Sequence, residues 1–202
     1  MKRMNTEEGF TGLEAAIVLI AFVVVAAVFS YVVLGAGFFT TQKAQEVVYT
    51  SVDQASSSVE ILGQVYGFGT YNDGTKQYDD VGRVQFKVGL TAGGSPVDFS
   101  MTSLTFSTDK DVYRLALKDK EVIDDASTIG AQQWGVIKIF NSDGRDLLLE
   151  NQEQFVILAQ TAEEKNLTAN QPFTLEIRPS VGASYAITRK ITPSISAVNV
   201  LN

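Results

Sequence analysis

The sequence contains no charged side chain between Ala15 and Gln42, and Glu14 stands directly before this run. A secretory signal has an apolar core of about 7–15 residues, followed by a small-residue cleavage site. The run here is longer, and its end at residues 35–42 has no Ala-x-Ala motif. Because about 20 apolar residues are enough to cross a bilayer, the run predicts a membrane-spanning helix. Neither kind of segment accounts for an acid at the start of the apolar stretch.

A family resemblance begins just before this run. The short leader carries Lys2 and Arg3 and ends in Gly9, which Phe10 follows. The residues that carry the resemblance are Gly9-Phe10, Gly12, Glu14, Ala15 to Ala27, Phe29-Ser30-Tyr31, Gly35, Gly37-Phe38 and Val59 to Gly63. They resemble the N-terminal third of the archaeal flagellins (archaellins), which belong to the type IV pilin-like superfamily. The rest of the chain matches only the β-rich outer domain that this family implies.

The resemblance implies three parts: a class III (prepilin-type) leader peptide at residues 1–9, a filament-core helix at 10–66 and an outer domain at 67–202. A prepilin-type peptidase would cut between Gly9 and Phe10 on the cytoplasmic side, and the apolar segment would stay on the mature subunit. Basic residues beside a membrane segment tend to remain cytoplasmic, which agrees with Lys2 and Arg3 in the leader.

The composition favours a structural surface protein. The 202 residues include no Cys and no His, which removes disulfides, thiol nucleophiles and the side chain used most often for proton transfer. The formal net charge of −7 argues against a nucleic-acid partner, because nucleic-acid-binding proteins present a basic face. The sequence has no Gly-x-x-x-x-Gly-Lys-Ser/Thr loop, so a motor ATPase would be another protein. We therefore predict no enzymatic activity, no cofactor and no metal.

Periodicity predicts one long helix over residues 10–66. Up to Phe39 it is apolar on all sides, as in a helix buried in lipid or in protein. The glycines that would allow neighbouring helices to approach closely are Gly12, Gly35 and Gly37. Beyond Lys43 a single apolar stripe follows, made of Val48, Val52, Ala55, Val59 and Leu62. Such a helix would be roughly 80 Å long, beyond a hydrocarbon core of about 30 Å, so its excess must pack against something.

The remaining residues read as an all-β domain. Alternation of apolar and polar side chains predicts strands at 84–88, 97–106, 112–117, 134–140, 173–177 and 185–191. Turn sequences such as Asn72-Asp73-Gly74 separate them, and a short helix or turn is expected near residues 161–166. The fold class is therefore α+β: a long hydrophobic helix followed by a sandwich or barrel, which we expect to be immunoglobulin-like.

Glu14 is the main candidate for a functional side chain. After cleavage behind Gly9 it would be the fifth mature residue, where the pilin-like family carries its acid. A carboxylate beside an apolar helix is costly unless it is paired. The new ammonium of Phe10 on a neighbouring subunit could supply the partner, and the pair would set the axial stagger between subunits. The alternative is an interfacial acid that favours the positive end of the helix.

Other candidate sites are less specific. Asn166-Leu167-Thr168 is the only Asn-x-Ser/Thr sequon, and archaellins are often N-glycosylated on the outer domain. The segment from Asn141 to Glu150 resembles part of a calcium loop, but Ile139 occupies the first ligand position and cannot ligate, which favours a hairpin turn.

Two acidic pairs and one aromatic residue complete the candidates. Asp79-Asp80 and Asp124-Asp125 could be read as catalytic carboxylates, but neighbouring residues on a strand point to opposite faces, and acids in loops are usually solvated. Trp134 starts an apolar alternation and is predicted to lie in the core rather than to bind sugar.

The sequence thus predicts a structural subunit of the archaellum, the rotating filament that drives swimming. Expected partners are further copies of itself, paralogous subunits, a prepilin-type peptidase, and the motor and export platform in the membrane. The precursor would reside in the inner membrane and the filament outside the cell. Two alternatives stay open: a subunit of a type IV pilin-like adhesion fibre, and a monomeric membrane-anchored binding domain.

Overall fold

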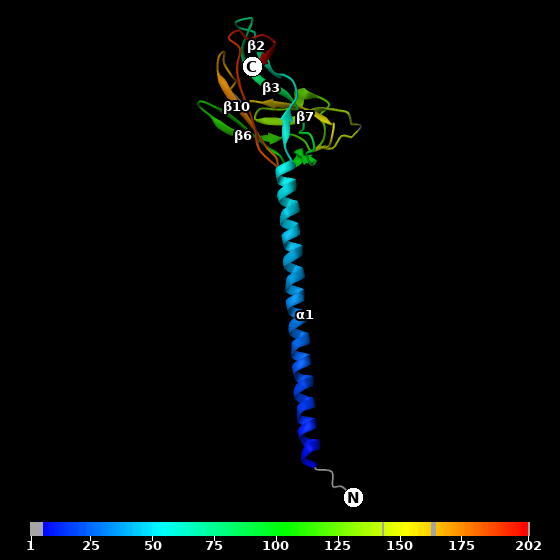
Figure 1. Cartoon of the computed structure of the whole chain (residues 1–202). Coiled ribbons are helices and arrows are strands. Elements are labelled where there is room, and N and C mark those ends of the chain that lie inside the picture. The colour runs from blue at the N-terminus through cyan, green and yellow to red at the C-terminus, as the bar shows by residue number, and fades with distance from the viewer. Residues whose placement is uncertain (1–5, 143, 163–164, 202) are drawn as a thin grey trace. The chain divides into compact units, whose positions relative to one another are not determined.

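A computed structural model of the chain describes residues 6–142, 144–162 and 165–201. The chain divides into two compact units, residues 1–50 and residues 51–202 (Figure 1). The first unit consists of helix α1, and the second contains the end of α1 and all the strands. One long helix followed by an all-β domain is the predicted order.

Helix α1 runs from Thr6 to Ser56, so the predicted end near residue 66 is wrong. Serine is a poor residue for a helix interior because its hydroxyl competes for backbone hydrogen bonds, and Ser56, Ser57 and Ser58 follow one another here. The backbone carbonyls of Ser57 and Ser58 form hydrogen bonds with the β domain instead of continuing the helix. Ser57 O accepts from Ala183 N at 3.1 Å, and Ser58 O accepts from Thr91 N at 3.1 Å. The chain then continues as a strand.

The β domain consists of short strands joined by turns. Their bounds are β1 (Val59–Ile61), β2 (Val65–Asn72), β3 (Gln77–Leu90), β4 (Val97–Asp98), β5 (Ser103–Thr108), β6 (Val112–Leu117), β7 (Gln133–Phe140), β8 (Leu148–Leu149), β9 (Gln154–Gln160), β10 (Pro172–Arg178), β11 (Tyr185–Lys190) and β12 (Val198–Leu201). Two 3₁₀ turns are described, η1 (Phe99–Met101) and η2 (Ala126–Thr128). The predicted strand over 97–106 is broken by η1, and residues 161, 162, 165 and 166 are not helical.

Ten of the strands form one hydrogen-bonded sheet. Its order is β11-β10-β5-β6-β7-β9-β3-β2-β12, with β1 beside β3, while β4 and β8 form a separate pair. Strands β6 and β7 pair in parallel over two residues, and the other pairings are antiparallel. Of the two architectures that the sequence left open, the domain takes the barrel-like one, a large sheet that curls until it is nearly closed.

Aromatic side chains fill the core of this domain. Trp134 is 1% exposed, as predicted for a core residue. Phe99 packs edge-on against Trp134 and Phe155, with ring centroids 6.5 and 5.5 Å away. Phe106 stacks on Phe173 at 5.6 Å. Edge-on and offset contacts are the favourable arrangements for aromatic rings, so these pairs add to the stability of the core.

Strand β9 lies inside the sheet, between β7 and β3, and no alternation in the sequence predicted it. Phe155, Ile157 and Ala159 belong to the main core, whereas Leu158 packs on the other face with Ile123 and Ile129. A strand that is buried on both faces shows a continuous apolar run and no alternation. The alternation test therefore could not detect it.

Candidate assembly interface

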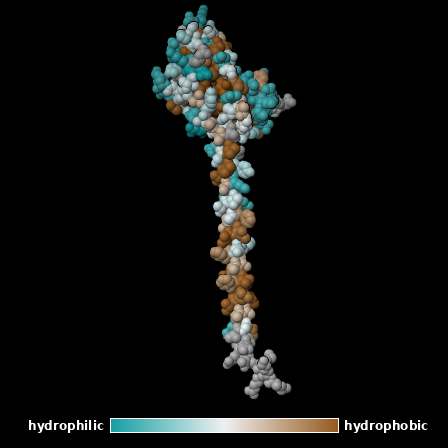
Figure 2. Space-filling view, viewed as in Figure 1, coloured by the Kyte–Doolittle hydropathy of each residue, from teal (hydrophilic) through white to brown (hydrophobic). Residues whose placement is uncertain are grey.

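The surface of α1 is apolar, and none of the described residues covers it between residues 12 and 52. Every described side chain from residue 12 to 52 is exposed, including Phe22 at 74% and Tyr31 at 78%. Figure 2 shows apolar side chains along the length of this helix. Soluble monomers rarely expose a continuous apolar patch larger than a few hundred Å². One segment, Gly12–Val52, is long and apolar enough to cross a membrane.

The two threonine hydroxyls within this surface are satisfied by the helix itself. Thr40 Oγ1 donates to Ala36 O at 2.8 Å, and Thr41 Oγ1 donates to Gly37 O at 2.9 Å. The first charges after Glu14 are Lys43 and Glu46, which pair with each other at 2.6 Å. Both threonine hydroxyls therefore have partners within the helix.

The predicted helix-packing glycines lie in open space. A Cβ added at Gly12, Gly35 or Gly37 would meet nothing within 4 Å. Residues two apart on an α-helix are separated by about 200° around its axis, so Gly35 and Gly37 provide narrow contact points on two different faces. Helices could approach α1 closely from two sides, as a bundle requires. Their packing role is still a prediction.

Two members of the predicted apolar stripe do not belong to the helix. Val48 and Val52 lie on α1 and are 59% and 57% exposed. Val59, by contrast, lies in β1 and is 2% exposed in the core of the β domain. Leu62 follows β1, and its amide donates to Lys87 O at 2.8 Å. Residues 59 and 62 continue the helical spacing in sequence only, because the β domain pairs this segment with β3.

The predicted processing and registry residues lie in the first turns of α1. Gly9 and Phe10 are helical, and their side-chain surroundings are outside the described residues. Glu14 is exposed on the same helix. Cleavage between Gly9 and Phe10 and the pairing of Glu14 with a neighbouring ammonium are therefore predictions that one subunit does not test.

Asn166, the predicted glycosylation site, is half-buried and hydrogen-bonded. Its Nδ2 donates to Asp80 Oδ1 at 3.0 Å, and its Oδ1 accepts from Thr161 Oγ1 at 2.8 Å. The following residue, Leu167, is fully buried and pairs with Val81. The amide nitrogen that a glycan would modify is therefore engaged in the folded domain.

The acidic pairs do not converge on a common centre. Asp79 Oδ2 accepts from Asn72 Nδ2 at 2.6 Å and from Thr75 Oγ1 at 2.9 Å, whereas Asp80 binds Asn166. In the other pair, Asp124 accepts two hydrogen bonds from the Arg145 guanidinium. The described residues contain no cluster of three or more His, Cys, Asp or Glu side chains that could hold a metal.

Asn141 and Asp125 each stabilise a turn. Asn141 has φ +64° and its Nδ2 donates to Gln152 O at 2.9 Å, which agrees with the hairpin-turn interpretation. Asp143, which the calcium-like pattern also required, lies outside the described residues. Asp125 Oδ1 accepts from Ser127 N at 2.9 Å at the start of η2. Hydrogen bonds from the Ser127 side chain and from its backbone amide lower the pKa of the Asp125 carboxyl.

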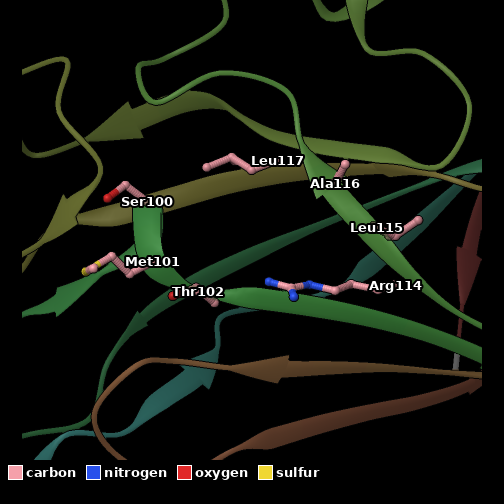
Figure 3. Close-up of a pocket in the computed structure, with 7 residues that line it drawn as sticks. All are labelled: Ser100, Met101, Thr102, Arg114, Leu115, Ala116 and Leu117. Atoms are coloured by element: carbon pink, nitrogen blue, oxygen red, sulfur yellow. The ribbon is translucent and has the colours of Figure 1, made fainter.

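An open pocket of about 380 Å³ lies beside η1 and β6. Its lining residues, all labelled in Figure 3, are Ser100, Met101, Thr102 and residues 114–117. Arg114 is the only charged residue among them, and its guanidinium extends toward Thr102 (Figure 3). The lining residues do not include a pair of acid and base.

Two features of the β domain were not found from the sequence. The first is Gly182, in the β10–β11 hairpin, which has φ +106° and lies so close to Ser57 that an added Cβ would be 2.0 Å from Ser57 O. The second is the pair Lys87 and Lys138, whose ammonium groups each lie 4.6 Å from the centre of the Phe140 ring. Both features bring together segments that are far apart in sequence. Only Gly182, as a glycine in a turn, could have been recognised from the local sequence.

Comparison with known proteins shows the family. The family model for archaeal-type flagellin matches residues 9–189, nearly the whole chain. This chain belongs to the archaeal-type flagellins. It is 42% identical over 206 residues to a probable flagellin 1 of Archaeoglobus fulgidus, with 100% of this chain and 98% of that protein covered.

Solved structures agree with this assignment. The archaeal flagellum of Methanospirillum hungatei strain JF1 matches with a TM-score of 0.69 and 33% identity, over 95% of this flagellin and 99% of that chain. The crystal structure of flagellin FlaB1 from Methanocaldococcus jannaschii matches with a TM-score of 0.58 and 16% identity, over 71% of this chain and 95% of the other. The second match shows a shared fold.

Proposed function

We propose that this flagellin polymerises through α1 into the filament that an archaeal cell rotates to swim. The chain is a structural subunit of the archaeal flagellum, a homopolymer outside the cell. The observation that carries the mechanism is that every described side chain of α1 between residues 12 and 52 is exposed. Apolar surface left in water costs about 25 cal/mol per Å², so a filament outside the cell requires identical helices to cover so long a helix. Head-to-tail contacts between identical subunits generate open helical filaments.

Processing and registry follow from the start of the chain. A prepilin-type peptidase would remove residues 1–9 and leave Phe10 with a free ammonium. That ammonium would pair with Glu14 of a neighbouring copy, because a carboxylate at the edge of an apolar bundle needs a counter-charge. The pair would fix how far each subunit is displaced along the filament. Before assembly the same apolar helix would hold the precursor in the inner membrane.

The other proposed partners are proteins of the assembly machinery and modifying enzymes. An export platform and a rotary motor in the membrane would insert and turn the filament, and paralogous subunits could join it. Glycosylation at Asn166 would have to precede folding, because its Nδ2 otherwise donates to Asp80. We propose no catalytic role and no cofactor for this chain.

The proposal is tested by placing one charge on α1 and one on the β domain. Val48→Asp alters a 59% exposed side chain of α1, and Val198→Asp alters a 54% exposed side chain of β12 as the matched control. We expect Val48→Asp to abolish filaments and swimming, and Val198→Asp to leave filaments in place. Mass spectrometry of the filaments should give Phe10 as the first residue. Assembly of Val48→Asp at normal yield would contradict the helix-bundle mechanism, and swimming without filaments would contradict the function.

A further inference from the structure

A groove of about 370 Å³ opens on the outer face of the sheet, above β3, β9 and β7. Val156 lies on its floor and is 7% exposed. Lys87 of β3 and Lys138 of β7 are both in register with Val156, so they flank it from the two sides. Both ammonium groups lie 4.6 Å from the ring centre of Phe140, which also lines the groove. Two cations thus share one aromatic ring above an apolar floor.

These two cations have no acidic partner within the described part of the chain. The ion pairs found there join Lys43 to Glu46 and three other pairs in which neither Lys87 nor Lys138 takes part. Glu60 lies in register with Gly89, two residues from Lys87, but forms no ion pair with it. In a chain with a net charge of −7, two neighbouring ammonium groups without an acid form a local positive site. Such a site favours an anionic group from outside the domain.

The opposite end of the same strand is acidic. The β2–β3 hairpin carries Asp73 and Asp79, both exposed, and one cation, Lys76. Hydrogen bonds from Asn72 and Thr75 fix the Asp79 carboxylate. At about 3.3 Å per residue, the step from Asp79 to Lys87 spans roughly 26 Å along β3. The strand therefore has a negative end and a positive end.

We propose that the Lys87–Lys138 groove receives the β2–β3 hairpin of a second copy, with Asp73 and Asp79 facing the two ammonium groups. This inference rests on the proposed function, because the filament is what places the β domains of adjacent copies in repeated contact. The two complementary ends lie on one strand and cannot meet within a subunit. A contact between them is therefore heterologous and repeats from copy to copy, as a helical array requires. The charges fix the orientation of neighbouring outer domains, while α1 contributes the greater part of the binding.

The absence of cysteine from the chain permits a direct test. The double variant Asp73→Cys/Lys138→Cys, assembled in cells that lack other flagellins, should form a disulfide ladder of dimers and higher multimers when its filaments are oxidised. The matched control Lys190→Cys/Lys138→Cys places one cysteine on β11 and should give no ladder. Filaments of Asp73→Cys/Lys138→Cys that stay monomeric on non-reducing gels would overturn this inference and leave the proposed function intact. Failure of the unsubstituted chain to form filaments would instead overturn the proposed function.

Charge exchange gives a second, independent measurement. Lys87→Glu should lower filament yield at least tenfold, whereas Lys190→Glu, with the same change of charge, should not. Adding Asp73→Lys to Lys87→Glu should restore most of the yield, and Asp79 is left unchanged because its hydrogen bonds shape the hairpin. Normal yield for Lys87→Glu, or no rescue by Asp73→Lys in a correctly folded chain, would overturn the pairing.

Discussion

Helix α1 and the β domain differ in the exposure of their apolar side chains. In the β domain Trp134, Phe155 and their neighbours are almost completely buried by other residues of the chain. In α1 the aromatic and branched side chains from residue 12 to 52 are exposed, among them Phe22 at 74%. The β domain therefore completes its own core, whereas the helix requires other molecules to complete one. The apolar surface that the chain leaves open indicates where it assembles.

The sharpest form of this contrast lies on either side of Ser56. Val52 is on α1 and 57% exposed, while Val59 is in β1 and 2% exposed. Val59→Asp should therefore unfold the β domain, with a loss of more than about 4 kcal/mol, because it buries an unpaired charge. Val52→Asp should leave the domain folded and abolish assembly. Thermal unfolding in detergent, followed by the fluorescence of Trp134, the only tryptophan, measures the difference.

Val52→Ala and Val59→Thr serve as milder controls for the same two positions. A β domain that melts at the same temperature in Val59→Asp as in the parent would show that residue 59 does not belong to the core. An equal loss of β-domain stability in Val52→Asp would show that residue 52 is buried as residue 59 is, contrary to their exposures of 57% and 2%.

A core residue of strand β9 gives the next largest expected change in the free energy of unfolding. Phe155→Ala should cost about 3–5 kcal/mol, because it leaves a cavity between Phe99 and the other core residues. Val198→Ala, at a 54% exposed position of β12, should change the free energy of unfolding by no more than about 0.5 kcal/mol. Chemical denaturation monitored by circular dichroism distinguishes these values. Similar costs for both variants would contradict the burial of Phe155 in the core.

A smaller effect is expected where α1 ends. Gly182→Ala places a Cβ 2.0 Å from Ser57 O in a conformation with φ +106°, and should cost about 1–3 kcal/mol. Gly93→Ala is the matched control, since Gly93 has φ +79° but nothing within 4 Å of an added Cβ, so only backbone strain of about 1 kcal/mol remains. Both values follow from melting curves. A larger loss for Gly93→Ala than for Gly182→Ala would contradict the close contact with Ser57.

The smallest effect concerns the exposed ion pair between Arg145 and Asp124, 2.8 Å long. Hydrogen bonds from the Arg145 guanidinium lower the pKa of the Asp124 carboxyl. A lowered pKa means that the contribution to stability is complete above the usual pKa of about 3.9 and disappears as the pH falls through the lowered value. Asp124→Asn should thus lower Tm slightly at pH 6 and not at pH 2. An equal decrease at both pH values would mean that charge is not the cause.

The sequence was sufficient where a local pattern carried the information. The uncharged run before Lys43 predicted α1, and alternation predicted β6 with the bounds that the structure has. Strand β9 was missed because both of its faces are buried, and the end of α1 was misplaced because Val59 continues the helical spacing by coincidence. The Lys87–Lys138 groove depends on the pairing of β3 and β7 with β9, which no local pattern encodes.

The internal hydrogen bonds of Thr40 and Thr41 bear on how a subunit could be moved. Lipid tails and a bundle of apolar helices are similarly apolar environments. A helix that moves from one to the other therefore gains or loses little hydrophobic free energy. The hydroxyl groups of Thr40 and Thr41 keep their partners during this exchange. If the precursor resides in a bilayer as proposed, its extraction would depend on the van der Waals fit between helices. The energetic cost would fall on Glu14 and on the Lys43–Glu46 pair, the charges of this helix that would change surroundings.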